Sequence, residues 1–265
     1  MKRVVLLLFS VIWISVVSGS QIIPDQQEKN SIDTLKARLT RAQSMVRQGN
    51  NEEASAIYLS IMKDYPDNKD AVQGWIMANA SKAQGGPEFI QKALEELGKQ
   101  YPENTGIVFF QAFIQASTGQ NEMALENFNK LIKLQPDTAV NYIAKGQVLL
   151  EMQKFDEAYL ALDRATSLDP GRMDIWGMKA IALARLGRYD EALVSINKQI
   201  DLVPEFPSGI YNRACIYSLK GDRENALEDL RKAVTMNPSF RKQAVNDDDF
   251  KNLFNDEEFK KITMQ

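Results

Sequence analysis

The chain has 265 residues, of which 44% are hydrophobic and 25% are charged, and its formal net charge is −3 at pH 7. This composition supports a sizeable core and excludes wholesale disorder, and the sequence pI of about 5.3 argues against a nucleic-acid scaffold. The sequence contains no histidine, which excludes Ser-His-Asp and Cys-His catalysis and imidazole metal sites. We therefore expect a protein that is not an enzyme and has no cofactor and no metal site.

The first residues have the layout of a secretory signal. Lys2 and Arg3 are followed by an apolar run over residues 4–17 and by small residues at 18–20, so cleavage is expected after Gly19 or Ser20. The apolar run is shorter than the roughly 18 to 20 residues of a full membrane span. We expect residues 1–20 to be a signal peptide, with an uncleaved N-terminal anchor through residues 4–17 as the alternative. Either reading predicts an exported, extracytoplasmic protein that is periplasmic, secreted or membrane-anchored.

A short polar stretch separates this signal from the first periodic segment. Residues 21–30 contain Pro24 and no apolar periodicity, and we interpret them as a tether. The first helix is expected to begin at Ser31, whose side chain can cap it before Leu35 and Leu39. Residues 31–265 are then expected to form one helical domain.

Prolines recur at an interval of 34 residues through most of the chain. If Met173 is counted as position 1 of a repeat, large apolar residues recur at positions 4, 11 and 24, small residues at 8 and 20, and proline at 32. Small residues let two antiparallel helices approach, and large ones fill the space around the contact. Gly187 and Gly221 stand where a first helix must stop and turn. The prolines that define the interval are Pro102, Pro136, Pro170, Pro204 and Pro238.

This pattern resembles the tetratricopeptide repeat, a family of paired helices with a 34-residue period. The resemblance implies an all-α fold, a right-handed α–α superhelical solenoid of about six helix pairs with a C-terminal capping segment. The expected repeats are 35–68, 69–104, 105–138, 139–172, 173–206 and 207–240, and the expected cap is 241–265.

The second repeat departs from the period. Pro66 and Pro102 are 36 residues apart, which places about two extra residues near the Gly85-Gly86-Pro87 turn. This repeat also has Ile76 and Ile90 where small residues are expected. We therefore expect the helix stacking to change here.

The resemblance also implies a binding site. In the family, the first helix of each repeat lines an inner groove that receives an extended or helical peptide. We call the corresponding residues of this chain, at repeat positions 2, 5, 9 and 12, the groove positions. Their lining is largely apolar and aromatic, and the alternative is that some of them pack between repeats. The predicted groove residues are Phe109, Phe113, Val140, Ile143, Gln147, Asp174, Ile181 and Tyr211, and Ser208, Cys215 and Ser218 hold further groove positions in the last repeat.

Two other features are given structural interpretations. Cys215 is the only cysteine and directly follows the small residue Ala214, so we expect a buried apolar side chain rather than a reactive thiol. The acidic clusters 247–249 and 256–258 precede apolar residues, and we expect them to cap helix N-termini. In the segment after the last repeat, Ala244, Phe250, Leu253 and Phe259 are expected to cover the apolar edge of the final unit.

Together these patterns favour a non-catalytic scaffold or adaptor outside the cytoplasm that binds a protein or peptide partner in an apolar groove. No nucleic-acid partner is expected. The alternative function is a self-associating structural solenoid within an envelope assembly, which requires a homo-oligomer.

Overall fold

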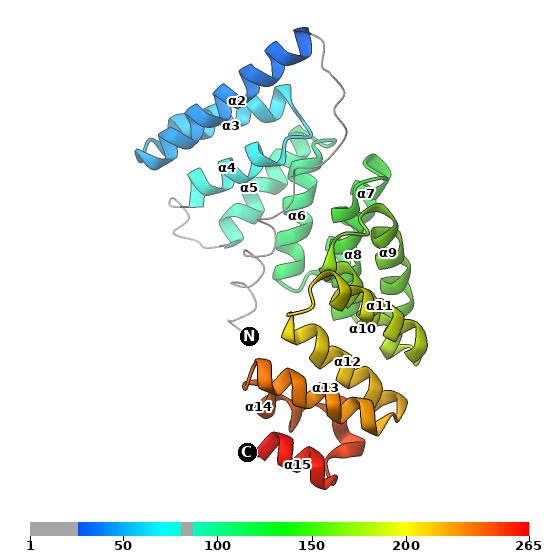
Figure 1. The fold of residues 1–265 in the computed structure, drawn as a ribbon. Coiled ribbons are helices and arrows are strands. Elements are labelled where there is room, and N and C mark those ends of the chain that lie inside the picture. Colours follow the sequence, from blue (N-terminus) through cyan, green and yellow to red (C-terminus); the bar gives the residue numbers. More distant parts are fainter. Residues whose placement is uncertain (1–25, 81–86, 265) are drawn as a thin grey trace. The chain divides into compact units, whose positions relative to one another are not determined.

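The structure is a computed structural model that describes residues 26–80 and 87–264, and these residues form helices and connecting turns without any strand (Figure 1). The predicted signal, residues 1–20, and the first part of the tether lie outside the described residues. In the described part of the chain, no helix is both long enough and apolar enough to cross a membrane. The helices are α2 Gln26–Arg47, α3 Asn51–Asp64, α4 Lys69–Ala80, α5 Pro87–Gln100, α6 Thr105–Ser117, α7 Asn121–Leu134, α8 Ala139–Glu151, α9 Phe155–Leu168, α10 Met173–Arg185, α11 Tyr189–Leu202, α12 Pro207–Lys220, α13 Arg223–Met236, α14 Phe240–Ala244, the 3₁₀ helix η1 Asp248–Leu253 and α15 Glu257–Met264.

The helices follow one another in pairs, and the predicted all-α fold is confirmed. From α4 onward, the first helix of each pair begins at the residue where the proline interval starts a repeat: Lys69, Thr105, Ala139, Met173 and Pro207. Small residues permit the close contact within a pair. A Cβ atom added at Gly146 of α8 would lie 2.7 Å from Cγ of Leu162 in α9, a distance that no Cβ can adopt without a shift.

One helix boundary differs from the prediction. Helix α2 begins at Gln26, five residues before Ser31, so the last part of the predicted tether is helical. Gln, Glu and Lys have high helix propensity, and Gln26-Gln27-Glu28-Lys29 therefore extends a helix that carries no apolar periodicity in its first turns. The prediction used apolar spacing and a capping residue, neither of which detects such an extension.

The irregular second repeat keeps its two helices, α4 and α5, and residues 81–86 between them lie outside the described residues. Residues 81–86 separate α4 from α5, whereas the three residues 118–120 separate α6 from α7. The extra residues thus fall in a segment outside the described residues. The side chain of Asn104, which is 1% exposed, accepts a hydrogen bond from the Ile107 N–H at the start of α6. It also donates to the Met62 carbonyl in α3, at 3.2 Å, and so joins α6 to α3 across the irregular repeat.

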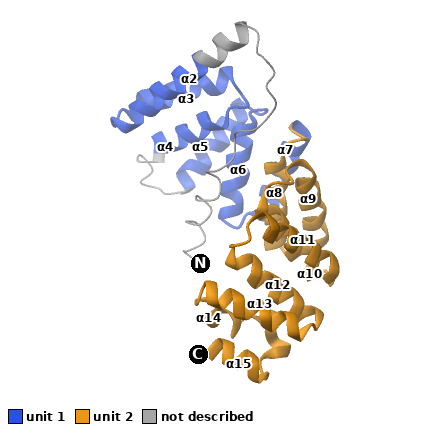
Figure 2. Cartoon of the chain, viewed as in Figure 1, with its two compact units in different colours: residues 1–134 blue, residues 135–265 orange. Residues whose placement is uncertain are grey.

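The chain divides into two compact units, residues 1–134 and 135–265 (Figure 2). The described part of unit 1 has a core that runs from α2 to α6 and includes Tyr58, Met62, Trp75 and Leu94. In unit 2, one cluster lies between α10, α11 and α12 and includes Leu183 and Ile196. A larger cluster joins α12 and α13 to the C-terminal segment.

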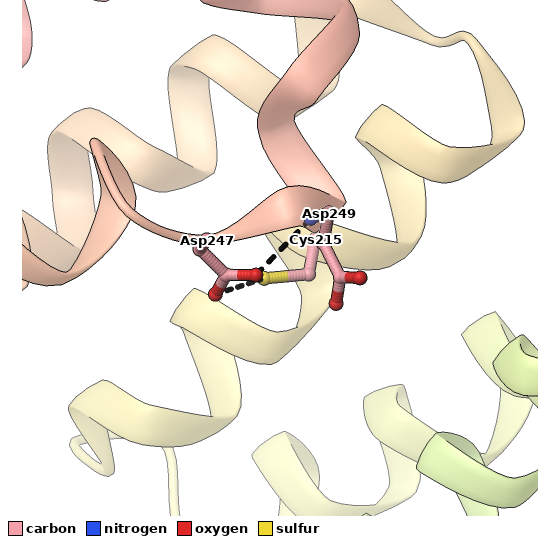
Figure 3. A group of neighbouring side chains, drawn as sticks. All are labelled: Cys215, Asp247 and Asp249. Carbon is pink, nitrogen blue, oxygen red and sulfur yellow. Dashed lines mark hydrogen bonds between the residues drawn. The ribbon is translucent and has the colours of Figure 1, made fainter.

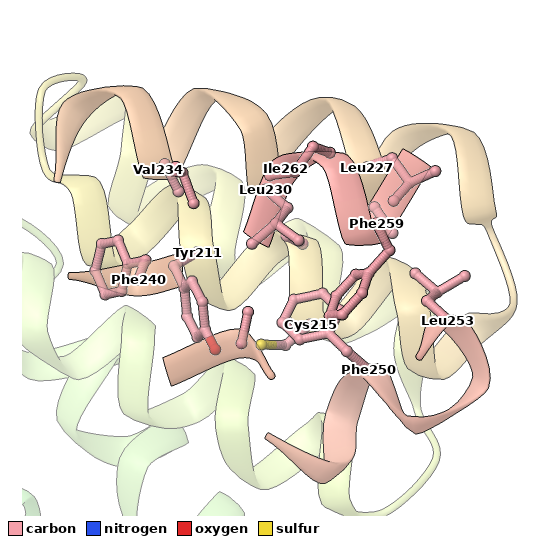
Figure 4. Packing of buried hydrophobic residues seen from close by; sticks show 14 of the residues in the cluster. Tyr211, Cys215, Leu227, Leu230, Val234, Phe240, Phe250, Leu253, Phe259 and Ile262 are labelled. Atoms are coloured by element: carbon pink, nitrogen blue, oxygen red, sulfur yellow. The ribbon is translucent and has the colours of Figure 1, made fainter. Parts of the chain in front are cut away.

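The C-terminal segment closes unit 2 as predicted (Figure 4). Ala244, Phe250, Leu253 and Phe259 are all buried against α12 and α13, which confirms their role as a cap. The predicted capping by carboxylates is also confirmed for one residue of each acidic cluster. The Asp247 side chain accepts the Asp249 N–H at the start of η1, and Asp256 accepts the N–H groups of Glu258 and Phe259 at the start of α15.

Candidate functional site

Two predicted groove residues lie in unit 1, on α6. The Phe109 side chain is 5% exposed and makes edge contacts with Phe110 and Phe128, and the Lys69 ammonium lies 4.5 Å from its ring centroid. Phe109 therefore belongs to the core of unit 1, and its placement in an open groove is wrong. Phe113 is half-buried.

On α8 of unit 2, the groove positions divide by exposure. Val140 and Gln147 are half-buried, whereas Ile143 is 6% exposed and is part of the packed interior. The prediction that Ile143 lines an open surface is therefore wrong. The Gln147 amide donates to Oε1 of Glu151, one turn further along the helix. The side chains of Val140 and Gln147 thus remain partly accessible on α8.

On α10, the groove positions Asp174 and Ile181 are both half-buried. Arg172 donates to both carboxylate oxygens of Asp174, at 2.8 to 3.1 Å, and so holds that side chain in one orientation. Ile181 adds an apolar side chain two turns further along. In unit 2, therefore, α8 and α10 each present one aliphatic and one polar group at groove positions.

On α12, the groove position Tyr211 is covered by the chain itself (Figure 4). Its side chain is 2% exposed, its ring stacks on Phe240 with centroids 4.5 Å apart, and its hydroxyl donates to Oδ2 of Asp247 at 2.8 Å. Burial raises the pKa of this phenol, and the Cys215 sulfur and the Asp247 carboxylate raise it further. The prediction that Tyr211 lines an open groove is wrong, because the C-terminal segment lies over it.

Cys215 is buried on the same face of α12, as predicted for a small apolar side chain (Figure 3). Its Sγ lies 3.9 Å from Oδ2 of Asp247, and one ligand atom each from Cys215, Asp247 and Asp249 lie within 4.8 Å of one another. Burial raises the pKa of the thiol, and the neighbouring carboxylates add to this effect, so the sulfur is protonated at neutral pH. Both carboxylates also have partners within the protein, namely the Tyr211 hydroxyl and the Arg185 guanidinium.

Two contacts of this region were not predicted from the sequence. Arg185, at the end of α10, donates to both oxygens of Asp249 at 2.5 and 3.0 Å. Ser218 of α12 and Asn252 of η1 are joined by two hydrogen bonds, from the Ser218 hydroxyl to the Asn252 side chain and from the Asn252 amide to the Ser218 carbonyl. The acidic run and the groove positions were each visible in the sequence. The ion pair between Arg185 and Asp249 was not visible, because 64 residues separate the two residues and the 34-residue period does not relate them.

The arrangement described above is that of a family of helical repeats. Models of the tetratricopeptide repeat match residues 36–68, 107–138, 143–208 and 208–240. The chain belongs to the tetratricopeptide repeat family. The matched segments leave out residues 69–106, which contain the irregular repeat.

Relatives and solved structures agree with this assignment. The chain is 23% identical over 231 residues to the DnaJ homolog subfamily C member 3 homolog of Dictyostelium discoideum, covering 81% of this chain and 46%, or about half, of that relative. A tetratricopeptide repeat protein from Parabacteroides merdae is similar with a TM-score of 0.57 and 18% identity over 88% of this chain and 98% of its own. YrrB, described as a TPR protein with an unusual peptide-binding site, has a TM-score of 0.57 and 19% identity over 68% of this chain and 92% of its own. At these identities, the two solved structures show the fold.

Proposed function

We propose that the chain is a non-catalytic scaffold that binds a peptide or helix of a partner protein on the groove positions of unit 2. The observation that carries the proposal is the exposure pattern of α8 and α10. Val140 and Ile181 remain partly accessible, whereas Ile143 and Tyr211 are removed from solvent by packing. Gln147 and the fixed carboxylate of Asp174 supply polar groups beside them, and a few placed polar groups on an apolar surface are typical of sites that orient a ligand.

Membership of the tetratricopeptide repeat family supports a scaffold for protein–protein interaction. The similarity to YrrB, a TPR protein with an unusual peptide-binding site, supports a peptide or helix as the ligand. The setting outside the cytoplasm is part of the proposal and rests on the signal-like sequence of residues 1–20.

The test is a comparison of partner capture by two double variants. The first, Val140→Ser with Ile181→Ser, removes the accessible apolar groups of the groove positions. The matched control, Leu160→Ser with Val194→Ser, removes aliphatic groups of similar size that are 66% and 70% exposed on α9 and α11. Crosslinking in the native cell followed by mass spectrometry should lose the partner only in the first variant. Equal capture by both folded variants, or loss of the partner only in the Leu160→Ser with Val194→Ser variant, would contradict the proposed site.

Self-association is a second candidate, and one observation favours it. Leu160 and Val194 hold the same repeat position on α9 and α11, and both are largely exposed. An apolar pair of this kind is a candidate contact between copies. Light scattering over a concentration series should then show a dimer that the Leu160→Ser with Val194→Ser variant dissociates. A monomeric mass at every concentration would rule this candidate out.

A further inference from the structure

The groove positions of α12 are occupied by residues of the same chain. We call residues 247–253 the strap. Tyr211 donates to the Asp247 carboxylate, the Cys215 sulfur lies beside the same carboxylate, and Ser218 exchanges two hydrogen bonds with Asn252 (Figures 3 and 4). The side chains at three consecutive groove positions of α12 thus contact the strap. A cap that only shielded the apolar edge of the last repeat would not need to follow these positions.

The first half of the strap is held by polar contacts. Arg185 of α10 forms a two-bond ion pair with Asp249, whose side chain is 14% exposed, and Tyr211 of α12 binds Asp247 at 2.8 Å. Ion pairs with two parallel hydrogen bonds are stronger than single ones and fix the orientation of the carboxylate. Arg185 on α10 and Tyr211 on α12 therefore bind two carboxylates of the strap, which are two residues apart in the sequence.

The second half of the strap is held by apolar contacts. Phe250 is fully buried and its ring packs edge-on against Tyr211 with centroids 5.7 Å apart, and Leu253 is 5% exposed. Between the carboxylates, Asp248 is exposed, and a polar hollow lined by Arg185, Gln243 and residues 246–249 lies beside it. The strap therefore has an acidic end that is only partly buried and an aromatic end that is fully buried, so the acidic end exposes less apolar surface when it lifts.

We propose that the strap is an intramolecular ligand of α12, which closes the end of the groove to partners until its acidic end is released. This inference rests on the proposed function, because it concerns the same groove positions. The segment that competes with the acidic end of the strap carries the same chemistry, two carboxylates spaced two residues apart. A ligand tethered in the same chain acts at an effective concentration in the millimolar range, so a free segment displaces it only when the tethered contacts are weakened.

The lone thiol makes release of the strap measurable without any partner. Cys215 lies under Asp247, so a thiol reagent reaches it only when the acidic end lifts. Asp249→Asn removes the charge that binds Arg185, and we expect the labelling rate of Cys215 to rise about tenfold. Asp249 also raises the pKa of the thiol, so the rate is measured at saturating reagent, where opening of the strap and not the thiolate fraction limits labelling. Asp190→Asn is the matched control, because it breaks the ion pair between Asp190 of α11 and Lys220 of α12 without touching the strap, and it should leave the rate unchanged. The urea midpoint of each variant is measured alongside, to separate local opening from unfolding.

Equal labelling rates in the two variants, or rates that simply follow the urea midpoints, would overturn the strap as an opening element. A second arm tests the ligand chemistry in the Asp249→Asn protein. A synthetic peptide of residues 245–255 at millimolar concentration should slow the labelling of Cys215, and the same peptide with asparagine at 247 and 249 should not. If neither peptide slows labelling, the proposal that this surface receives a segment with two carboxylates is wrong. Neither result depends on whether Val140 and Ile181 bind a partner.

Discussion

Gln153 adopts a backbone conformation that four other helix pairs of the described chain assign to glycine. Its φ is 58°, and the residues that hold the same position in the turns after α2, α6 and α10 and at the end of α12 are Gly49, Gly119, Gly187 and Gly221, each with φ between 73° and 85°. A residue with a Cβ atom is strained in the left-handed region by about 1 to 2 kcal/mol. The backbone of the turn between α8 and α9 is therefore more strained than the corresponding turns that contain glycine.

Gln153→Gly should increase the stability of the protein. The substitution relieves the left-handed strain and loses part of that gain to the greater freedom of glycine in the unfolded chain, for a net gain of up to about 1 kcal/mol. Chemical denaturation measures it as a higher midpoint with an unchanged slope. Gly187→Ala is the complementary variant, because it places a Cβ atom at φ 73° and should lower the midpoint. A midpoint that falls for Gln153→Gly would show that its side chain contributes more than the strain costs.

Asp256 couples the stability of the cap to pH. The Arg223 guanidinium, and then the N–H groups of Phe259 and Glu258, lower the pKa of this carboxyl to about 2. Because the folded-state pKa lies below the ordinary value of about 3.9, the ionised group stabilises the fold above pH 4, and this contribution is lost as pH falls toward 2. The wild-type protein should therefore lose more stability between pH 5 and pH 2.5 than Asp256→Asn does, as measured by thermal unfolding. Parallel pH profiles for the two proteins would contradict this role.

At the scale of the helices, sequence spacing was a reliable guide wherever one face of a helix is buried. The 34-residue interval predicted the starts of α4, α6, α8, α10 and α12, because the apolar, small and proline positions all report the same packing. It failed at the start of α2, where polar residues form a helix. It also could not show which groove positions stay accessible, because Ile143 and Val140 look alike in sequence and differ only in what packs against them.

The cap depends on one aromatic side chain more than on its neighbours. Phe250 is fully buried between Tyr211 and Phe259, with ring centroids 5.7 Å from each. Phe250→Ala should destabilise unit 2 by about 3 to 5 kcal/mol, because the truncation leaves a cavity in a closed core.

Phe254→Ala is the matched control for this loss. Phe254 is half-buried and contacts Phe259 from the edge of the cluster, with centroids 5.9 Å apart, so its removal should cost clearly less. Urea titrations monitored by circular dichroism compare the two variants. Similar losses would show that the cap is an adaptable surface layer rather than a packed core.

At the scale of the whole molecule, unit 2 has the parts that a folding unit needs. It contains three helix pairs, its own apolar clusters and a cap at its C-terminal end. In repeat proteins, stability comes from each repeat and its nearest neighbours, so a run of repeats with a cap can fold alone. Residues 135–265 expressed separately should give a helical circular dichroism spectrum and a cooperative thermal transition. A fragment without cooperative melting would show that these repeats depend on residues before 135.

The site was less predictable than the fold, for a reason that belongs to the whole chain. Helix pairs are set by contacts within about 34 residues, which a periodic sequence displays. The strap covers α12 through three contacts: Asp247 with Tyr211, Asp249 with Arg185, and Asn252 with Ser218. The two residues of each contact are 34 to 64 positions apart in the sequence. Because the C-terminal segment does not follow the 34-residue period, its residues could not be matched to their partners from the sequence.

The side chain of Asn104 has a consequence for how this protein could have changed in length. It joins the end of α3 to the start of α6, so the path of the chain is fixed on both sides of the irregular repeat. A change in the number of residues within this repeat would therefore leave the contact between α3 and α6 in place.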